Sequence, residues 1–135
     1  MPRYMLDTNM CVYLMKNQSE QLAARFSTCY VGDVVMSAIT YAELEYGAFL
    51  SPRGQEEQGN LKALVEDIPV APFNAAAAKA YGPIRAATRG RTKGALDKLI
   101  AAHAVALDVT LVTNNERDFA AYPGLKFENW LGKVP

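Results

Sequence analysis

Short apolar runs alternate with longer amphipathic stretches along this chain. The runs at 4–6, 34–36 and 110–113 predict buried strands, and further strands are expected at 67–73 and 125–130. Pro69 and Pro72 favour a sheet edge for the strand at 67–73, because proline has no N–H to donate to a neighbouring strand. Apolar residues at helical spacing predict helices between the strands, at 10–16, 18–28, 39–50, 55–66, 74–88 and 96–107, with a short helix after Asn115. Pro83 is a candidate for a kink or break in the helix at 74–88.

Strands that alternate with helices are typical of an α/β fold with a parallel sheet. The chain has 135 residues, and half of them are hydrophobic, which is enough for one core. We therefore expect a single domain over residues 1–135. In such folds ligands bind at the carboxyl ends of the strands, so the residues that follow each predicted strand are the candidates for chemistry.

Acidic and amide side chains follow the predicted strands. Asp7 ends the first strand, and Asn115 and Asp118 follow the strand at 110–113. Glu43 lies about one and a half turns into the helix after the strand at 34–36. Asp97 lies near the start of the helix that leads to the strand at 110–113. Because the carboxyl ends of parallel strands share one edge, we expect these distant segments to bring their side chains together there.

Glu43 and Asp97 are each expected on the apolar face of a helix, where a carboxylate is unusual. An unpaired buried carboxylate costs roughly several kcal/mol, and one divalent cation would neutralise several such groups at once. The apolar neighbours are Ile39, Ala42, Tyr46, Gly47 and Leu50 around Glu43, and Ile100, Ala101 and Ala104 in line with Asp97. Three aromatic residues are likewise expected to form a helix packing face: Tyr41, Tyr46 and Phe49.

Each acid, taken singly, also has an ordinary structural interpretation. Asp7 and Asp97 could be acids that favour a helix N-terminus, and Glu43 could pair with an arginine inside the fold. The convergence of three acids on one edge favours a metal site over these three separate explanations. Oxygen ligands suit Mg²⁺ or Mn²⁺, as one or two ions. Such a site typically acts on phosphates, where one ion activates a water molecule and a second stabilises the leaving oxygen.

Histidine and cysteine are not expected at this site. His103 lies off the face that carries Asp97, so we interpret it as a structural residue. Cys11 and Cys29 match no zinc or redox motif, and we interpret them as reduced thiols. The sequence contains no signal peptide and no apolar run long enough to span a bilayer. We therefore expect a cytoplasmic protein with no membrane partner.

The charges balance, with 14 basic and 14 acidic residues. A protein that holds nucleic acid by bulk electrostatics usually has a basic excess, so a nucleic-acid partner would require local clustering. Such a cluster is present between residues 85 and 98, where only Asp97 opposes five basic residues: Arg85, Arg89, Arg91, Lys93 and Lys98.

Four segments resemble, in order, the consecutive motifs of PIN-domain proteins: YMLDTN, SAITYAELEYGA, LDKLIAAHA and LVTNNERDF. They are most similar to the VapC-type toxins of toxin–antitoxin operons, and the match extends from Tyr4 to Trp130. The resemblance implies a three-layer α/β/α sandwich with a central parallel sheet of about five strands. It also implies a metal-dependent endoribonuclease that leaves a 5′-phosphate and a 3′-hydroxyl.

The resemblance further implies partners. Similar toxins cut structured RNAs, including initiator transfer RNA and the sarcin–ricin loop of ribosomal RNA, and are usually dimers. A cognate antitoxin silences them and also binds operator DNA, so contact with that DNA would come only through the antitoxin. Three residues of the loop before Asp97 are then candidates for holding the RNA backbone: Arg89, Arg91 and Lys93. An ordinary solvated loop remains an equal alternative for this cluster.

Carried over residue by residue, the family's first three acids fall on Asp7, Glu43 and Asp97. The fourth position is open, because Asn115 stands where many PIN domains carry aspartate, and Asp118 matches a later acid. The expected catalytic residues are Asp7, Glu43, Asp97 and Asp118, and the expected metal ligands are Asp7, Glu43, Asp97 and Asn115. Three polar residues are expected to support them: Asn9 by a hydrogen bond to Asp7, and Ser37 and Thr113 by orienting the acids or a water molecule, unless the last two only end their strands.

Other classes of protein fit less well. Receiver domains and haloacid phosphatases also place aspartate at a strand end. The receivers need a second early acid and a lysine after a later strand, and the phosphatases need aspartate where Asn9 stands. A nucleotide-binding domain is disfavoured because no glycine-rich phosphate loop follows the first strand. A catalytically impaired PIN-fold binding module is the remaining alternative, and the retention of three acids disfavours it.

Overall fold

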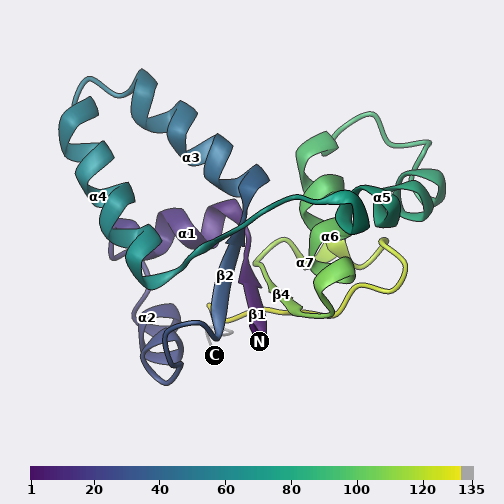
Figure 1. The fold of residues 1–135 in the computed structure, drawn as a ribbon, viewed down its shortest axis with the longest axis horizontal. Helices are drawn as coiled ribbons and strands as arrows, with labels where there is room; N and C mark the ends of the chain where they lie inside the picture. Colours follow the sequence, from purple (N-terminus) through teal and green to yellow (C-terminus); the bar gives the residue numbers. More distant parts are fainter. Residues whose placement is uncertain (132–135) are drawn as a thin grey trace.

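The computed structural model describes residues 1–131, in which a 5-stranded parallel sheet forms the centre (Figure 1). The strands are β1 (Tyr4–Leu6), β2 (Val34–Ser37), β3 (Val70–Ala71), β4 (Thr110–Val112) and β5 (Phe127–Glu128). Their order across the sheet is β3-β2-β1-β4-β5. Leu6 in β1 is level with Met36 in β2 and Val112 in β4, so the carboxyl ends of these three strands lie at the same edge.

Helices cover both faces of the sheet, which confirms the predicted three-layer α/β/α architecture (Figure 1). One layer contains α1 (Thr8–Met15), α2 (Glu20–Ser27), α3 (Ala38–Leu50) and α4 (Gly54–Asp67). The other contains α5 (Ala75–Ala87), α6 (Ala95–Leu107) and α7 (Glu116–Phe119). None of the helices described within residues 1–131 is long and apolar enough to cross a membrane.

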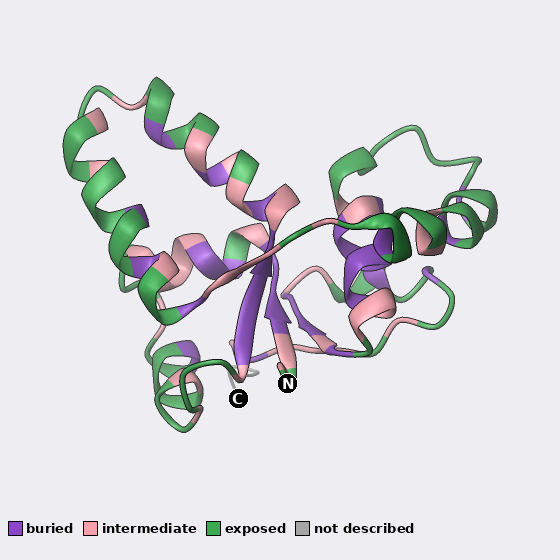
Figure 2. Ribbon diagram, viewed as in Figure 1, coloured by how far each residue is buried: buried purple, intermediate pink, exposed green. Residues whose placement is uncertain are grey.

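The central strands contribute to two hydrophobic cores, one on each face of the sheet. Successive side chains of a strand point to opposite faces. Leu6 therefore packs with Met10 and Leu22 in the first layer, whereas Met5 packs with Ile100 in the second. Both faces are covered, so β2 is buried along its length, and β1 and β4 are buried except at their first residues (Figure 2). Strands of this kind read as uninterrupted apolar runs, which is why the sequence pattern predicted them.

The predicted elements are present, with shifts at their ends. β3 and β5 are shorter than the strands expected at 67–73 and 125–130, and β3 lies at a sheet edge, as its flanking prolines indicated. Pro83 lies inside α5, and that helix continues from Ala75 to Ala87. Because proline has no N–H, the Lys79 carbonyl one turn earlier lacks its helical hydrogen bond. Pro83 and Lys79 are both exposed, so water can satisfy that carbonyl.

α3 buries a different face from the one that its apolar pattern predicted. Tyr46, Phe49 and Leu50 are 65%, 83% and 60% exposed, so the predicted packing face is wrong. The side chains that α3 buries are Thr40, Leu44 and Ala48. α3 packs against α1 and α4, and smaller side chains let helices approach more closely than aromatic ones. The exposed outer face of the α3–α4 pair is visible in Figure 2.

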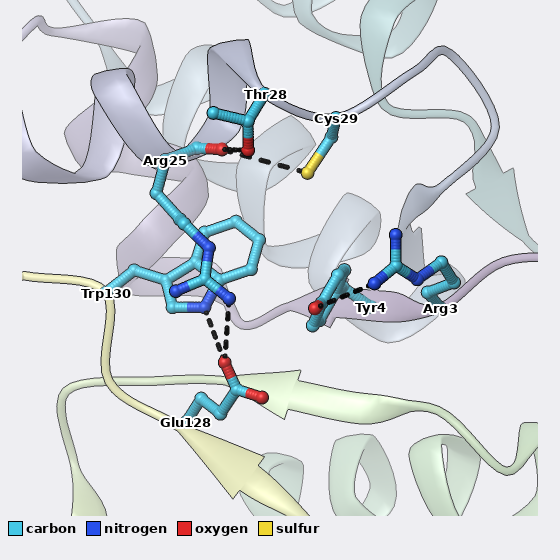
Figure 3. A network of polar contacts seen from close by, with 7 residues as sticks. All are labelled: Arg3, Tyr4, Arg25, Thr28, Cys29, Glu128 and Trp130. Carbon is cyan, nitrogen blue, oxygen red and sulfur yellow. Dashed lines mark hydrogen bonds and ion pairs between the residues drawn. The ribbon is translucent and has the colours of Figure 1, made fainter.

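A cluster of aromatic and charged side chains holds α2 against the segment that follows β5 (Figure 3). Glu128 accepts hydrogen bonds from Arg25 at 3.3 Å and from the indole N–H of Trp130 at 3.0 Å. The Arg25 guanidinium lies 4.8 Å from the centre of the Trp130 ring, which also meets the Tyr4 ring edge-on at 4.9 Å. Trp130 is buried whereas Arg25 and Glu128 are partly exposed, so the apolar contacts of Trp130 stabilise this junction more than the ion pair does. Cys29, which lies beside this cluster, is a free thiol, as is the buried Cys11.

Candidate active site

Asp7 lies at the carboxyl end of β1 and caps α1. Its Oδ1 accepts a hydrogen bond from the backbone N–H of Met10 at 3.0 Å, and the residue is only 4% exposed. Burial raises the pKa of the Asp7 carboxyl, and the Glu43 charge adds to that effect. Hydrogen bonds from the Thr113 hydroxyl and from the backbone at Met10 and Asn9 oppose it. Asp7 is therefore both a helix cap and a buried acid at the sheet edge.

Glu43 reaches the same edge from α3, held by two threonines. The Thr8 hydroxyl donates to Glu43 Oε1 at 2.8 Å, and the Thr8 and Thr40 hydroxyl oxygens lie 3.3 Å apart. Glu43 is half-buried at the border of the face that α3 packs against α1. The sequence analysis missed both threonines. The only signal for Thr8 in the sequence is its position directly after Asp7.

Asp97 lies in the first turn of α6 and is half-buried. The pKa of Asp97 is raised to about 6. Burial is the largest cause, and the negative charges of Asp7, Glu43 and Asp118 add to it. Ile100, the next residue along its face, is fully buried, so the predicted apolar face of this helix is confirmed. Asp97 therefore lies close enough to the other three acids for their charges to act on it.

Asp118 and Asn115 meet at the start of α7. Asn115 Nδ2 donates to Asp118 Oδ2 at 3.0 Å. Arg91 Nη1 lies 3.8 Å from Asp118 Oδ1 and donates to the Asp118 carbonyl at 3.3 Å. Of the two candidates for the fourth position, Asp118 is the one whose charge acts on Asp97, whereas Asn115 orients the Asp118 carboxylate.

Hard oxygen donors dominate this edge, and they fit a divalent cation of the Mg²⁺ or Mn²⁺ type. Among residues 1–131, no arginine or lysine forms an ion pair with Asp7, Glu43 or Asp97, which removes the paired-arginine explanation for Glu43. In the same residues, no three acid, histidine or cysteine side chains are grouped closely enough to hold a metal ion by themselves. An open arrangement of this kind suits a cation that keeps part of its water shell.

The basic loop at 89–94 lies against the acids. A pocket of about 430 Å³ separates the loop from α6 and α7, and we call it the loop pocket. Arg91 and Lys93 line it from the loop, and Asp97 and Asp118 line it from the helices. The remaining residues that line the loop pocket are Gly90, Thr92, Gly94 and Tyr122. The structure thus brings two of the three predicted RNA-binding residues next to the acids, whereas Arg89 is exposed outside this pocket.

A family model described as the PIN domain matches residues 4–125. The chain belongs to the PIN-domain family. This PIN domain is 38% identical over 132 residues to the tRNA(fMet)-specific endonuclease VapC of Shigella flexneri, a match that covers 96% of this chain and 99% of the relative. It is 36% identical over 135 residues to ribonuclease VapC2 of Rickettsia felis, with coverage of 94% and 97%. These matches confirm the resemblance to VapC-type proteins.

Solved structures agree with the sequence matches. The DNA-bound VapBC structure from Salmonella typhimurium contains a chain that matches with a TM-score of 0.89 and 35% identity, covering 96% of this chain and 99% of that chain. The structure of VapBC2 from Rickettsia felis, bound to a promoter DNA fragment, matches with a TM-score of 0.85 and 34% identity, covering 94% and 98%.

Three polar residues that were expected to support the acids of this PIN domain lie in different surroundings. The Asn9 side chain is exposed because it projects outward from the first turn of α1, and only its backbone N–H approaches Asp7. Thr113 is buried beside Asp7 and accepts a hydrogen bond from the Asn115 backbone at 3.0 Å. Ser37 caps α3 and lies 2.7 Å from Nδ1 of His103.

His103 is buried behind the acidic edge and does not lie among the acids. Its ring meets Phe73 edge-on at 5.3 Å, and burial lowers the pKa of the imidazole. Within residues 1–131, Nε2 has no partner at hydrogen-bond geometry, although the nearby Pro72 carbonyl opposes the lowering of the pKa, and Nδ1 contacts Ser37. These contacts agree with the interpretation of His103 as a structural residue.

Lys98 belongs to the basic cluster in the sequence, but in the structure it is buried beneath the loop. Its ammonium donates to the carbonyls of Thr88 at 3.2 Å and Arg91 at 3.0 Å, and the residue is 6% exposed. Lys98 is therefore unavailable to a ligand. It fixes the backbone of the loop from which Arg91 reaches Asp118.

Replacing Lys98 by methionine should lower the free energy of unfolding by about 1–3 kcal/mol, because two loop carbonyls lose their donor. The measurement is urea denaturation of both proteins under the same conditions. The matched control is Lys93→Met, which removes an exposed lysine from the same loop and should change stability by less than about 0.5 kcal/mol. Equal effects of the two substitutions would show that the Lys98 ammonium does not hold the loop.

Proposed function

We propose that this PIN domain is a metal-dependent endoribonuclease toxin of the VapC type, which hydrolyses RNA phosphodiester bonds at the acidic edge. The observation that carries the proposal is the electrostatic coupling at that edge. Three neighbouring carboxylates help to raise the pKa of Asp97 to about 6. Asp7, Glu43 and Asp97 have no basic ion-pair partner within residues 1–131, so this concentration of negative charge is unfavourable for stability alone and is suited to a cation.

In this proposal Asp7, Glu43 and Asp97 hold one or two Mg²⁺ or Mn²⁺ ions. Asp118 completes the set, and Asn115 acts through its hydrogen bond to Asp118 or through its own amide oxygen. When bound, the cation supplies charge neutralisation for the phosphate and a nucleophile derived from water near neutral pH. Thr8 orients the Glu43 carboxylate, and the backbone N–H of Met10 orients that of Asp7.

Arg91 and Lys93 are proposed to hold the RNA backbone, because they line the loop pocket next to Asp97 and Asp118. Contacts to phosphate position a substrate without reading its sequence. Arg89 is proposed to contribute from the exposed part of the loop. Thr113 is proposed to act through its hydrogen bond to Asp7, and Ser37 through its contact with His103.

The proposed partners follow the relatives. One relative is named for its action on tRNA(fMet), and the related complexes are VapBC assemblies bound to DNA. We propose a structured transfer or ribosomal RNA as substrate, a cognate antitoxin that contacts operator DNA, a homodimer, and a cytoplasmic location for a single domain over 1–135. The exposed apolar side chains of α3 support a protein partner on this surface: Tyr46, Phe49 and Leu50.

Purified protein should be incubated with total bacterial RNA in Mg²⁺, Mn²⁺ or EDTA, beside the variant Asp7→Ala. Discrete fragments that require metal and are absent with the variant would support the nuclease, and end mapping would identify the substrate. The rival is a PIN-fold binding module that has lost its chemistry. Absence of cleavage with either metal, together with normal bacterial growth when the protein is expressed without an antitoxin, would support that rival instead.

Reversing the loop charges by Arg91→Glu with Lys93→Glu should weaken RNA binding, and more at low salt than at high salt, because phosphate contacts release counterions. The affinity for RNA in EDTA at two salt concentrations is the measurement. Lys62→Glu with Lys79→Glu, two exposed changes on α4 and α5, is the matched control because it alters the net charge by the same amount. A loss of affinity that does not depend on salt, or that is equal in the control, would argue against phosphate contacts by this loop.

A further inference from the structure

Tyr122 follows α7 and is held rigidly in the core of the second layer. Its ring meets Phe119 edge-on at 5.4 Å, and the residue is 4% exposed. The ring therefore has a structural role that phenylalanine could fill equally well. The hydroxyl is the part of the side chain that packing does not explain.

The hydroxyl of Tyr122 lies at the wall of the loop pocket. It is 3.6 Å from the point that a Cβ on Gly94 would occupy, so the bare glycine backbone leaves space in front of it. Burial raises the pKa of Tyr122, and the charge of Asp97 adds to this effect while that of Arg91 opposes it. The phenol thus remains a neutral donor near pH 7. Its oxygen is not among the fully buried polar atoms without a partner in residues 1–131, so a ligand in the loop pocket can reach it.

The surroundings of the hydroxyl identify the chemical class of its partner. Arg91 and Lys93 line the same pocket and favour an anion, and Asp97 and Asp118 border it on the side of the acidic edge. The pocket's volume of about 430 Å³ falls within the range of about 300–1,000 Å³ for small-molecule sites. A phosphate with its attached ribose fits this size and charge.

We propose that the Tyr122 hydroxyl donates a hydrogen bond to a non-bridging oxygen of the RNA phosphate next to the scissile one. Arg91 and Lys93 would balance the charge of that phosphate, and Phe119 would hold the phenol ring at a fixed angle. The proposal rests on the proposed ribonuclease function and adds a residue to its substrate-binding surface. Gly94 contributes by its lack of a side chain, and its φ of 81° is one that other residues rarely adopt.

The test compares Tyr122→Phe with the wild type on a short RNA that contains the mapped cleavage site. The substitution keeps the ring, so thermal unfolding should stay within a few degrees, and kcat/KM should fall about tenfold or more. The matched control is Tyr4→Phe, because Tyr4 lies at the amino end of β1 and its hydroxyl contacts Arg3 at 3.4 Å (Figure 3). The control should cleave within about twofold of the wild type.

A second substrate distinguishes a direct contact from an indirect effect. An RNA with a methylphosphonate at the phosphate on either side of the scissile one lacks an acceptor oxygen there. The wild type should lose at least the same factor with one of these substrates, because the methylphosphonate also removes the charge that Arg91 and Lys93 balance. Tyr122→Phe should lose less than the wild type at that position, since its hydrogen bond is already absent. Additive losses at both positions, or wild-type activity of Tyr122→Phe, would overturn the inference and leave the ribonuclease function standing. Absence of metal-dependent cleavage by the wild type would overturn both.

Discussion

Replacing Asp7 by asparagine should reduce RNA cleavage by at least about a thousandfold while leaving the protein at least as stable as the wild type. The amide keeps an oxygen that can accept the hydrogen bond from Met10, so the cap of α1 is retained. It removes a negative charge that is 4% exposed and has no basic partner among residues 1–131. Activity and stability should therefore change independently, or in opposite directions.

Both properties should be measured on the same preparation. Cleavage of the mapped RNA in Mg²⁺ or Mn²⁺ gives the activity, and urea denaturation in EDTA gives the free energy of unfolding. We expect the free energy of unfolding to stay unchanged or to rise by up to about 2 kcal/mol, because the amide replaces a buried carboxyl whose charged form is disfavoured by burial, which raises its pKa. The control is Asp108→Asn, which neutralises a side chain that is 89% exposed. Loss of activity with an equal loss of stability would assign Asp7 a structural role only.

Cleavage at subsaturating Mg²⁺ should fall about tenfold for each pH unit below about 6, because Asp97 must lose its proton before its carboxylate can bind a cation. Burial, then Asp7, Glu43 and Asp118, raise that pKa, so the fall should begin about two units above the ordinary range of an aspartate. Rate measurements from pH 5 to 8 at several Mg²⁺ concentrations would show it. High Mg²⁺ should restore activity at low pH, since the cation competes with the proton. A flat profile from pH 8 to 5 at low Mg²⁺ would contradict the raised pKa.

The same pKa has a consequence for stability in EDTA. An acid whose pKa is higher in the folded state than in the unfolded state binds its proton more tightly when folded. The stabilisation from protonated Asp97 is therefore full below about pH 3.8 and is lost as the pH rises through about 6. The metal-free protein should become less stable between about pH 4 and 6, and this slope should level off above about pH 6. Asp97→Asn should reduce this slope, whereas Asp108→Asn should keep it.

The order of elements and three of the acids could be predicted from the sequence, because both depend on local pattern. The strands β1, β2 and β4 are buried on both faces, so each appears as a short apolar run. Asp7 directly follows such a run. Asp97 lies in line with Ile100, which the structure buries. Four motifs in one order then identified the family, because four motifs in the right order are a more specific signal than any single motif.

The same local reasoning was wrong where partner helices decide which face is buried. The large apolar side chains of α3 predicted its packing face, but α1 and α4 approach the side of Thr40, Leu44 and Ala48. Tyr46 and Phe49 are left exposed, and the Glu43 carboxylate is held by Thr8 from another helix. A periodic pattern indicates which residues share a face of a helix, but the helices packed against it decide which face is buried.

The sequence by itself determined the α/β fold, the family and the candidate acids, since these follow from the hydrophobic period, from the four motifs and from the positions of acidic residues relative to the predicted strands and helices. Only the tertiary structure decided the electrostatics of the site. The pKa of Asp97, the burial of Lys98 beneath the loop and the position of the Tyr122 hydroxyl all depend on contacts between segments far apart in the chain. Coulomb and desolvation energies depend on distance and burial in space, and neither can be read from separation along the sequence.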